Sequence, residues 1–284
     1  MKGKTVLITG ANTGIGRATT LALAGMGAKI VMLCHTRERG QKAMEEIKEK
    51  SDNPDIDLLV ADLSVQADVR RAAAEFAARY SRLHVLINNA GVILPNRVVT
   101  GDGLECTLAV NYLAPFLLTN LLRDRLKAAA PARIINVASG IQRALDFADL
   151  QGEKRYGGLR AYGESKTALI LHTYELARRL VGAGVTANCL HPGDIRTDIF
   201  RHYTGLFKLI LSISSPLMRS PEKGAQTPVY LASSPEVEGV TGRYFVNRRP
   251  VKSSASTYDE SVARRLWDIS AALTKLEINR EGTL

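Results

Sequence analysis

The sequence predicts an α/β fold with a doubly wound parallel sheet of about seven strands and helices on both faces. Short apolar runs alternate along the chain with stretches long enough for helices, such as 37–50 and 65–80. Near-continuous apolar strands separated by helices are typical of a parallel sheet that is covered on both sides. The strand-like runs are 4–9, 29–33, 56–60, 85–87, 133–137, 185–190 and 244–246.

Length and composition favour one large domain over residues 1–284. Of the 284 residues, 45% are hydrophobic and 23% are charged, which suits a sizeable buried core. The most irregular stretches are 140–160 and 194–222, and a helical tail is expected at about 253–284. In an open α/β sheet the ligand binds at loops beyond the carboxyl ends of the strands, so these stretches are candidates for the site.

A glycine-rich turn connects the first strand-like run to an alanine-rich helix. Gly10 permits a sharp turn, Gly14 lets backbone approach a pyrophosphate, and Gly16 lets the helix pack closely against the sheet. A strand, a glycine turn and a helix in direct succession are typical of a Rossmann-like dinucleotide site. The Gly-x-x-x-Gly-x-Gly spacing differs from the Gly-x-Gly-x-x-Gly form, and an ordinary turn is the alternative. The contacts expected from this turn are Gly10, Asn12, Thr13, Gly14, Ile15, Gly16 and Arg17.

Tyr162 and Lys166 form a candidate acid/base pair. On a helix, residues four positions apart share one face, so the ammonium group is expected near the phenol oxygen. A nearby positive charge favours the phenolate and brings the phenol pKa closer to neutrality, where a general acid or base works best. The same spacing occurs by chance on solvated helices, and it is the glycine turn that favours catalysis here.

Six motifs in order resemble those of the short-chain dehydrogenase/reductase family, and the resemblance covers nearly the whole chain. They are Thr9–Gly16, Asn88–Gly91, Asn111, Ser139, Tyr162 with Lys166, and Pro192 with Gly193. The segments 150–154, 224–227 and 263–268 look most like the retinol-dehydrogenase-like branch. The resemblance implies an NAD(P)-dependent oxidoreductase that transfers a hydride between its cofactor and a lipophilic, retinoid-like alcohol or carbonyl compound.

The resemblance also implies roles for four catalytic residues. It makes Ser139 the residue that holds the substrate oxygen and Tyr162 the one that exchanges a proton with it. Lys166 would lower the phenol pKa and bind the nicotinamide ribose, and Asn111 would hold a proton-relay water near the lysine. Taken alone, Ser139 fits a turn that caps backbone, and Asn111 fits an unremarkable helix position.

Further cofactor contacts follow from the same resemblance. Asp62 looks like the family's adenine-contacting acid, with Leu63 beside it, and a helix N-cap is its competing role. Small residues after the fourth strand let the chain pass close to the cofactor, and in the family they also steady the sheet. The segment after the sixth strand resembles the one that grips the nicotinamide half, although Pro and Gly also mark plain turns. These two segments contribute Asn88, Ala90, Gly91, Pro192, Gly193, Ile195 and Thr197.

The end of the second strand favours NADP(H) over NAD(H). An acidic residue there would bind a ribose 2′-hydroxyl and repel a 2′-phosphate, but no carboxylate occurs before Glu38. Arg17 and Arg37 are expected to clamp the phosphate instead. Two solvated arginines at helix starts are the alternative, and His35 departs from the arginine common in this branch.

The apolar run at 206–218 lies in the stretch 194–222, which matches the family's variable substrate lid. It is too short to span a bilayer, whose core needs about 20 apolar residues in a helix. Three hypotheses remain open for it: a lid over a lipophilic substrate, a contact with a membrane surface, and a core or dimer contact.

Composition sets the remaining expectations about partners and location. The net charge is +10, but no run of five basic residues occurs, so nucleic acid is not an expected partner. Three scattered cysteines predict reduced thiols, and the five histidines lack ligand spacing, so no metal site is expected. The first strand starts close to Met1, which leaves no room for a signal peptide or membrane helix and favours a cytoplasmic protein. Relatives suggest a homo-oligomer, either a dimer or a tetramer.

Three other function classes are alternatives. A non-catalytic dinucleotide-binding regulatory protein would keep the pocket, but the complete set of catalytic residues argues against it. An NAD(H)-dependent dehydrogenase of a different small substrate is a further alternative. An epimerase or dehydratase that uses the same Tyr and Lys pair is disfavoured by the short chain and the apolar run.

Overall fold

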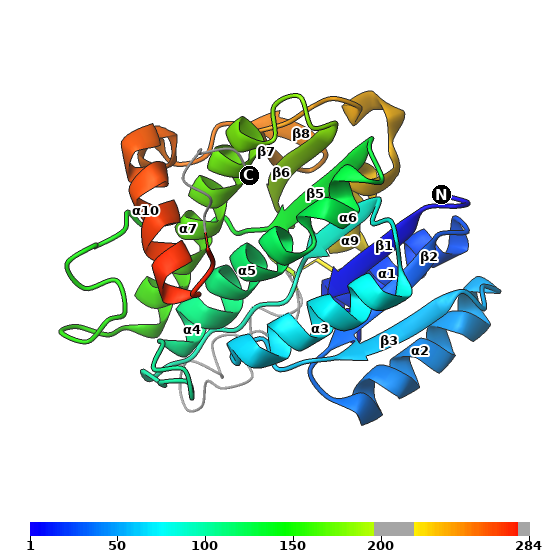
Figure 1. The fold of residues 1–284 in the computed structure, drawn as a ribbon, viewed down its shortest axis with the longest axis horizontal. Coiled ribbons are helices and arrows are strands. Elements are labelled where there is room, and N and C mark those ends of the chain that lie inside the picture. Colours follow the sequence, from blue (N-terminus) through cyan, green and yellow to red (C-terminus); the bar gives the residue numbers. More distant parts are fainter. Residues whose placement is uncertain (196–218, 278–284) are drawn as a thin grey trace.

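The computed structural model describes residues 1–195 and 219–277, and its centre is an eight-stranded sheet (Figure 1). The strand order is β3-β2-β1-β4-β5-β6-β7-β8, and all neighbours pair in parallel except β7 and β8. The strands are β1 (Thr5–Thr9), β2 (Lys29–Cys34), β3 (Ile56–Val60), β4 (Val85–Asn88), β5 (Ala132–Val137), β6 (Val185–His191), β7 (Tyr244–Val246) and β8 (Arg249–Val251). The predicted doubly wound α/β fold is confirmed.

The eighth strand is the difference from the expected seven. β8 pairs antiparallel with β7 after a two-residue turn, in which Asn247 and Arg248 have positive φ angles of 50° and 65°. Such a turn matches the twist of a hairpin. β8 has only three residues, all exposed, and Pro250 is one of them, so the sequence carries no apolar pattern that marks a strand there.

Helices cover both faces of the sheet (Figure 1). One apolar core joins the sheet to α1, α2 and α9, and the other joins it to α3, α5, α7 and α10. Val6 and Ile8 of β1 belong to the first core and Leu7 to the second, because successive side chains of a strand point to opposite faces. The helices and helical turns are α1 (Gly14–Gly25), α2 (Arg37–Ser51), α3 (Gln66–Arg79), α4 (Cys106–Leu108), η1 (Ala109–Leu113), α5 (Ala114–Leu121), α6 (Arg123–Lys127), α7 (Gly158–Arg179), α9 (Pro221–Ser233), η4 (Pro235–Val237), η5 (Ala255–Tyr258) and α10 (Glu260–Leu273).

The C-terminal helix α10 packs across α7 on the outside of the second core. Asp259 caps its N-terminus by accepting hydrogen bonds from the backbone of Ser261 and Val262. Trp267 is 1% exposed, and the guanidinium of Arg179 lies 4.3 Å from the centre of its ring system. A large aromatic side chain buried in this way is a main source of stability for the contact.

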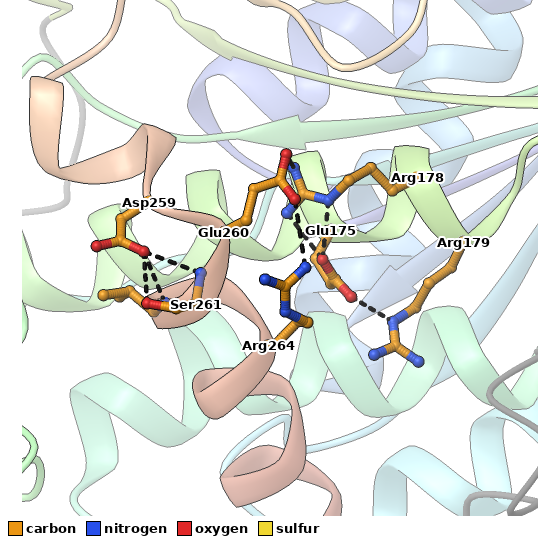
Figure 2. A network of polar contacts seen from close by, with 8 residues as sticks. Glu175, Arg178, Arg179, Asp259, Glu260, Ser261 and Arg264 are labelled. Carbon is orange, nitrogen blue, oxygen red and sulfur yellow. Dashed lines mark hydrogen bonds and ion pairs between the residues drawn. The ribbon is translucent and has the colours of Figure 1, made fainter.

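Figure 2 shows ion pairs within α7 and within α10, together with the pair of Arg178 and Glu260, which joins the two helices. Glu175 is only 4% exposed and accepts hydrogen bonds from Arg178 and Arg179, each at 2.7 Å. Glu260 at the start of α10 lies 3.9 Å from Arg178 and 3.3 Å from Arg264. Because the buried Glu175 carboxylate is paired twice, removal of either arginine would leave its charge less compensated.

The predicted lid falls largely outside the described residues. The positions 196–218 include the apolar run 206–218, so the lid, membrane and contact hypotheses all stay predictions. On either side of this gap, Ile195 and Arg219 form a parallel bridge, and the amide of Arg219 donates to the carbonyl of Asp194 at 2.9 Å. The described parts of the chain contain no helix that is long and apolar enough to cross a membrane.

Candidate active site

One cavity of about 840 Å³ lies where the carboxyl ends of the central parallel strands meet. The chain order reverses between β1 and β4, and an open α/β sheet binds its ligand at such a switch point. The predicted site residues that line the cavity are Gly10, Asn12, Thr13, Gly14, Ile15, Gly16, Asp62, Leu63, Ala90, Gly91, Ser139, Tyr162, Lys166, Pro192, Gly193 and Ile195. Thr197 lies outside the described residues.

The glycine turn after β1 forms a cradle that side chains would fill. Gly10 has a φ of +64°, a conformation that favours glycine. A Cβ atom on Gly16 would lie 2.1 Å from the carbonyl oxygen of Gly10, so helix α1 can approach the turn only with glycine at this position. No side chain caps the N-terminus of α1 at Thr13, which leaves its first backbone amides to bind an anion. This cradle fits the pyrophosphate of a dinucleotide.

Asn89 completes the cradle, and the sequence analysis missed it. Its side-chain nitrogen donates to the carbonyl of Thr9 at 2.9 Å, and its backbone amide donates to the Thr9 hydroxyl at 2.9 Å. Asn88, predicted as a cofactor contact, points the other way and donates to the side chain of Asn136 at 2.8 Å inside the sheet. Alternation along a strand separates these two neighbours, and the motif gave no sign of which asparagine faces the cavity.

The two arginines of the expected phosphate clamp, Arg17 and Arg37, do not lie at the cavity. Arg17 is paired with Glu46 at 2.5 Å, and among the described residues the cavity lining includes neither Arg17 nor Arg37. Arg39 lines the cavity instead, together with His35 and Thr36. Residues two positions apart on a helix point to different sides, so α2 cannot turn both Arg37 and Arg39 toward the ligand.

Asp62 fixes the neighbouring wall of the cavity after β3. Its carboxylate accepts the amide of Ser64 at 2.8 Å, and it lies 3.4 Å from the imidazole of His35. Its backbone amide donates to Asp68 at 2.9 Å. The N-cap of α3 is Val65, so the helix N-cap alternative for Asp62 is wrong. Its carboxylate caps the turn at Ser64, and Asp62 lines the cavity as predicted.

Ser139, Tyr162 and Lys166 meet at the other end of the cavity, and all are buried. The Ser139 hydroxyl accepts the amide of Ile141 at 3.1 Å and forms a hydrogen bond with the phenol of Tyr162. Lys166 donates from Nζ to the carbonyl of Val137 at 2.8 Å, and its nitrogen lies 5.7 Å from the centre of the Tyr162 ring. The expected catalytic group is thus assembled from β5, the loop after it, and one face of α7.

Burial, and not the lysine, dominates the acid/base properties of this group. It raises the pKa of Tyr162, and the hydrogen bond with Ser139 opposes that rise only in part. Burial also lowers the pKa of Lys166 to about 8. The expected fall of the phenol pKa toward neutrality is therefore wrong for the protein alone, because burial raises this pKa and the cause that lowers it is Ser139. Tyr162 keeps its proton at neutral pH.

Asn111 supports the cavity from behind. It lies in the π-helical turn η1, is fully buried, and is absent from the cavity lining in the described part of the chain. Its side chain accepts the amide of Val92 at 2.7 Å and donates to the carbonyl of Val92 at 2.9 Å and to the hydroxyl of Ser165 at 3.0 Å. These bonds fix the loop after β4, which does line the cavity. The water-relay role of Asn111 stays a prediction.

Comparison with known proteins identifies the family. A model of the short chain dehydrogenase family matches residues 4–204. The chain belongs to the short-chain dehydrogenase/reductase family. It is 44% identical to retinol dehydrogenase 14 of Mus musculus over 96% of the chain and 86% of that protein. It is 43% identical to retinol dehydrogenase 13 of Homo sapiens over 97% of the chain and 86% of that protein. The predicted membership in the retinol-dehydrogenase-like branch is confirmed.

Solved structures of other proteins share this fold. An uncharacterised protein from Mycobacterium paratuberculosis superposes with a TM-score of 0.79 at 31% identity, covering 98% of this chain and 96% of that one. Pseudomonas aeruginosa RhlG, solved in an active-site complex with NADP, has a TM-score of 0.70 at 27% identity. The match covers 86% of this chain and 94% of that one. Family membership and the cradle together make this protein an NAD(P)-dependent oxidoreductase. The described residues contain no group that could hold a metal ion.

Proposed function

We propose that this protein is an NADP(H)-dependent oxidoreductase that interconverts a lipophilic alcohol and its aldehyde or ketone, with retinoid-like molecules as the substrate class. One observation carries the proposal: a single cavity joins the glycine cradle to the Ser139, Tyr162 and Lys166 group. The names of the relatives, retinol dehydrogenases 13 and 14, support the retinoid class.

Apolar side chains at the catalytic end support a lipophilic substrate. Leu94, Val98, Val110 and Ile141 line this cavity. Val98 is 47% exposed and Ile141 is 41% exposed, so both present apolar surface to solvent. Exposed apolar surface at a cavity marks a binding site for an apolar ligand.

The catalytic group supplies the proton chemistry of the proposed reaction. NADPH, when bound, supplies the hydride, and the protein supplies orientation and charge placement. In reduction, Ser139 and Tyr162 hold the substrate carbonyl oxygen, and the phenol of Tyr162 gives its proton to that oxygen. The raised phenol pKa keeps this proton in place until transfer, and the Lys166 ammonium stabilises the phenolate that remains. Oxidation follows the same steps in reverse.

The end of β2 supports NADP(H) over NAD(H). His35, Thr36 and Arg39 line the cavity there, and no acidic side chain takes the position that would bind a ribose 2′-hydroxyl. We assign the 2′-phosphate contact to Arg39, since an arginine forms strong charge-assisted bonds to phosphate. This assignment replaces the predicted clamp of Arg17 and Arg37.

The proposal includes a cytoplasmic location and a homo-oligomer. Three free thiols, at Cys34, Cys106 and Cys189, support a reducing compartment. Cell fractionation tests the location, and light scattering coupled to gel filtration tests the assembly. A membrane-bound fraction would contradict the first, and a monomeric mass would contradict the second.

Cofactor oxidation with a set of carbonyl compounds tests the function. We expect the protein to oxidise NADPH with all-trans-retinaldehyde and medium-chain apolar aldehydes, and to do so poorly with hydrophilic aldehydes of similar reactivity. Val98→Asp is expected to raise the KM for the apolar aldehydes and to leave the Kd for NADPH unchanged. Binding of NADPH without turnover on any compound would favour the regulatory alternative, and preference for NADH would favour the NAD(H)-dependent one.

A further inference from the structure

The carbonyl oxygen of Ser139 accepts two hydrogen bonds from residues outside the catalytic group. The phenol of Tyr244 donates at 3.0 Å, and the side-chain nitrogen of Gln142 donates at 3.2 Å. Tyr244 is 4% exposed and lies on β7, beyond β6 from the strand that leads to Ser139. Two donors on one carbonyl fix the peptide that follows Ser139, and this peptide determines where the Ser139 side chain points.

Gln142 also connects this peptide to the C-terminal part of the chain. Its side-chain oxygen accepts the backbone amide of Ser254 at 2.7 Å, across 112 positions of sequence. An amide group that donates at one end and accepts at the other has a fixed orientation. Gln142 therefore holds Ser139 against the segment that begins at Ser253.

That segment is firmly attached to α7, the helix that carries Tyr162. The Ser253 hydroxyl lies 2.7 Å from the phenol of Tyr174, and the Ser253 amide donates to the phenol of Tyr258 at 3.0 Å. The rings of Tyr174 and Tyr258 stack with their centres 5.4 Å apart. Directly after it, α10 is tied to α7 by the ion pair of Arg178 and Glu260 at 3.9 Å, which Figure 2 shows. Ser139 and Tyr162 are thus held to one framework from both sides.

We infer that Tyr244 and Gln142 are positioning residues, which act through the backbone of Ser139 to direct its hydroxyl toward Tyr162. The inference rests on the proposed function, in which Ser139 and Tyr162 share the substrate oxygen. Neither residue touches the reacting atoms in this scheme. Loss of either donor lets the peptide after Ser139 rotate and weakens the bond between Ser139 and Tyr162.

Two effects on catalysis follow. The substrate oxygen is held less well, so kcat falls while the affinity for cofactor does not change. The hydrogen bond from Ser139 lowers the phenol pKa against the effect of burial, so a weaker bond lets that pKa rise further. Oxidation needs the phenolate, and its pH profile therefore shifts to higher pH.

Tyr244→Phe and Gln142→Met test the inference, with Tyr80→Phe as the matched control. Each test variant removes one donor to Ser139 and keeps the size of the side chain. Tyr80→Phe removes a phenol that bonds to Asp57 at the other side of the sheet. We expect kcat to fall by about 10-fold in both test variants, as misplacement of a reacting group predicts, with an unchanged Kd for NADPH. The control keeps the kcat and pH profile of the wild type.

A double-mutant cycle separates positioning from general loosening of the loop. In a Ser139→Ala background, Gln142→Met is expected to have little further effect on kcat, because the hydroxyl that it directs is gone. An equal fall in both backgrounds would overturn the inference. Gln142 is only half-buried, so Gln142→Met is expected to fold. Its double-mutant cycle with Ser139→Ala therefore decides the inference even where Tyr244→Phe does not fold.

Amide hydrogen exchange decides the inference without turnover. The Ile141 amide donates to the Ser139 hydroxyl, and we expect it to exchange faster in both test variants and at the wild-type rate in Tyr80→Phe. Unchanged exchange in both test variants would contradict the positioning role. A wild type that binds NADPH but never turns over would contradict the proposed function alone, since the exchange comparison would still stand.

Discussion

The two ends of the cavity are built in different ways. At the nucleotide end, the contacts come from backbone at the glycine turn and from exposed side chains such as His35 and Arg39. At the catalytic end, Tyr162 and Lys166 are 8% and 3% exposed, and burial shifts the pKa of both. Binding an anion needs free backbone amides and close approach, whereas proton transfer depends on the pKa of a side chain, which burial shifts.

This difference explains which properties of the site a sequence motif predicts correctly. A glycine is required by local geometry, so its place in the sequence is already informative about the turn. A pKa depends on everything packed around the group, so the spacing of Tyr162 and Lys166 correctly indicated their proximity but not the direction of the phenol shift.

The largest effect is expected from Tyr162→Phe at the catalytic end. Loss of the general acid is expected to lower kcat by a factor of about 10² to 10⁴. The Kd for NADPH, measured by isothermal titration calorimetry, is expected to stay unchanged because the nucleotide end is intact. Tyr230→Phe, which removes a surface phenol bonded to Glu236, serves as the control. Near-normal turnover in Tyr162→Phe would refute its role as the acid.

Lys166→Met is expected to lower kcat by less than Tyr162→Phe does and yet to stabilise the fold at pH 7. The folded pKa is about 8 against a usual 10.5, so the buried charge destabilises the protein by on the order of 3 kcal/mol, less the lost bond to Val137. Between about pH 8 and 10.5 the unfolded state binds the extra proton, so wild-type stability rises with pH and this penalty disappears. Urea unfolding of the wild type and of Lys166→Met at pH 7 and pH 10 measures this penalty. A variant less stable at both pH values would contradict the prediction.

At the nucleotide end, Gly16→Ala is expected to weaken NADPH binding and to lower the free energy of unfolding by about 1–3 kcal/mol. The new methyl group would meet the carbonyl of Gly10. Gly25→Ala in the same helix meets nothing within 4 Å and is expected to be neutral or slightly stabilising. Thermal unfolding compares the stability of the two variants, and calorimetric titration compares their Kd for NADPH. Equal behaviour of the two variants would mean that the close approach at Gly16 does not limit binding.

The smallest effect is expected from Arg39→Ala, which should raise the Kd for 2′,5′-ADP about 3- to 10-fold. The Kd for 5′-AMP is expected to stay the same, because that probe lacks the 2′-phosphate. Arg37→Ala is the matched control and is expected to change neither value. Added salt should reduce the Arg39 effect, because the side chain is exposed. A higher Kd for 2′,5′-ADP in Arg37→Ala instead would support the predicted clamp of Arg17 and Arg37.

The parts of the fold that could be predicted are those with a strong local signal. Seven strands, the glycine turn and the helices around them follow from apolar runs and glycine spacing. β8 could not be predicted, because three exposed residues with a proline carry no such signal. Among site residues, Asn89 and Arg39 were missed beside Asn88 and Arg37, which were chosen. In each pair the sequence supplied the right residue type, and only the direction of the side chain differed.

The sequence by itself determined the α/β class, the family and the residues of the proposed catalytic group, since these depend on local backbone requirements and on residue types in a fixed order. Only the tertiary structure decided which neighbour faces the cavity, how far burial shifts Tyr162 and Lys166, and how Tyr244 and Ser254 support Ser139. Those properties arise from contacts between segments far apart in the sequence, such as the 105 positions between Tyr244 and Ser139, and no local pattern records them.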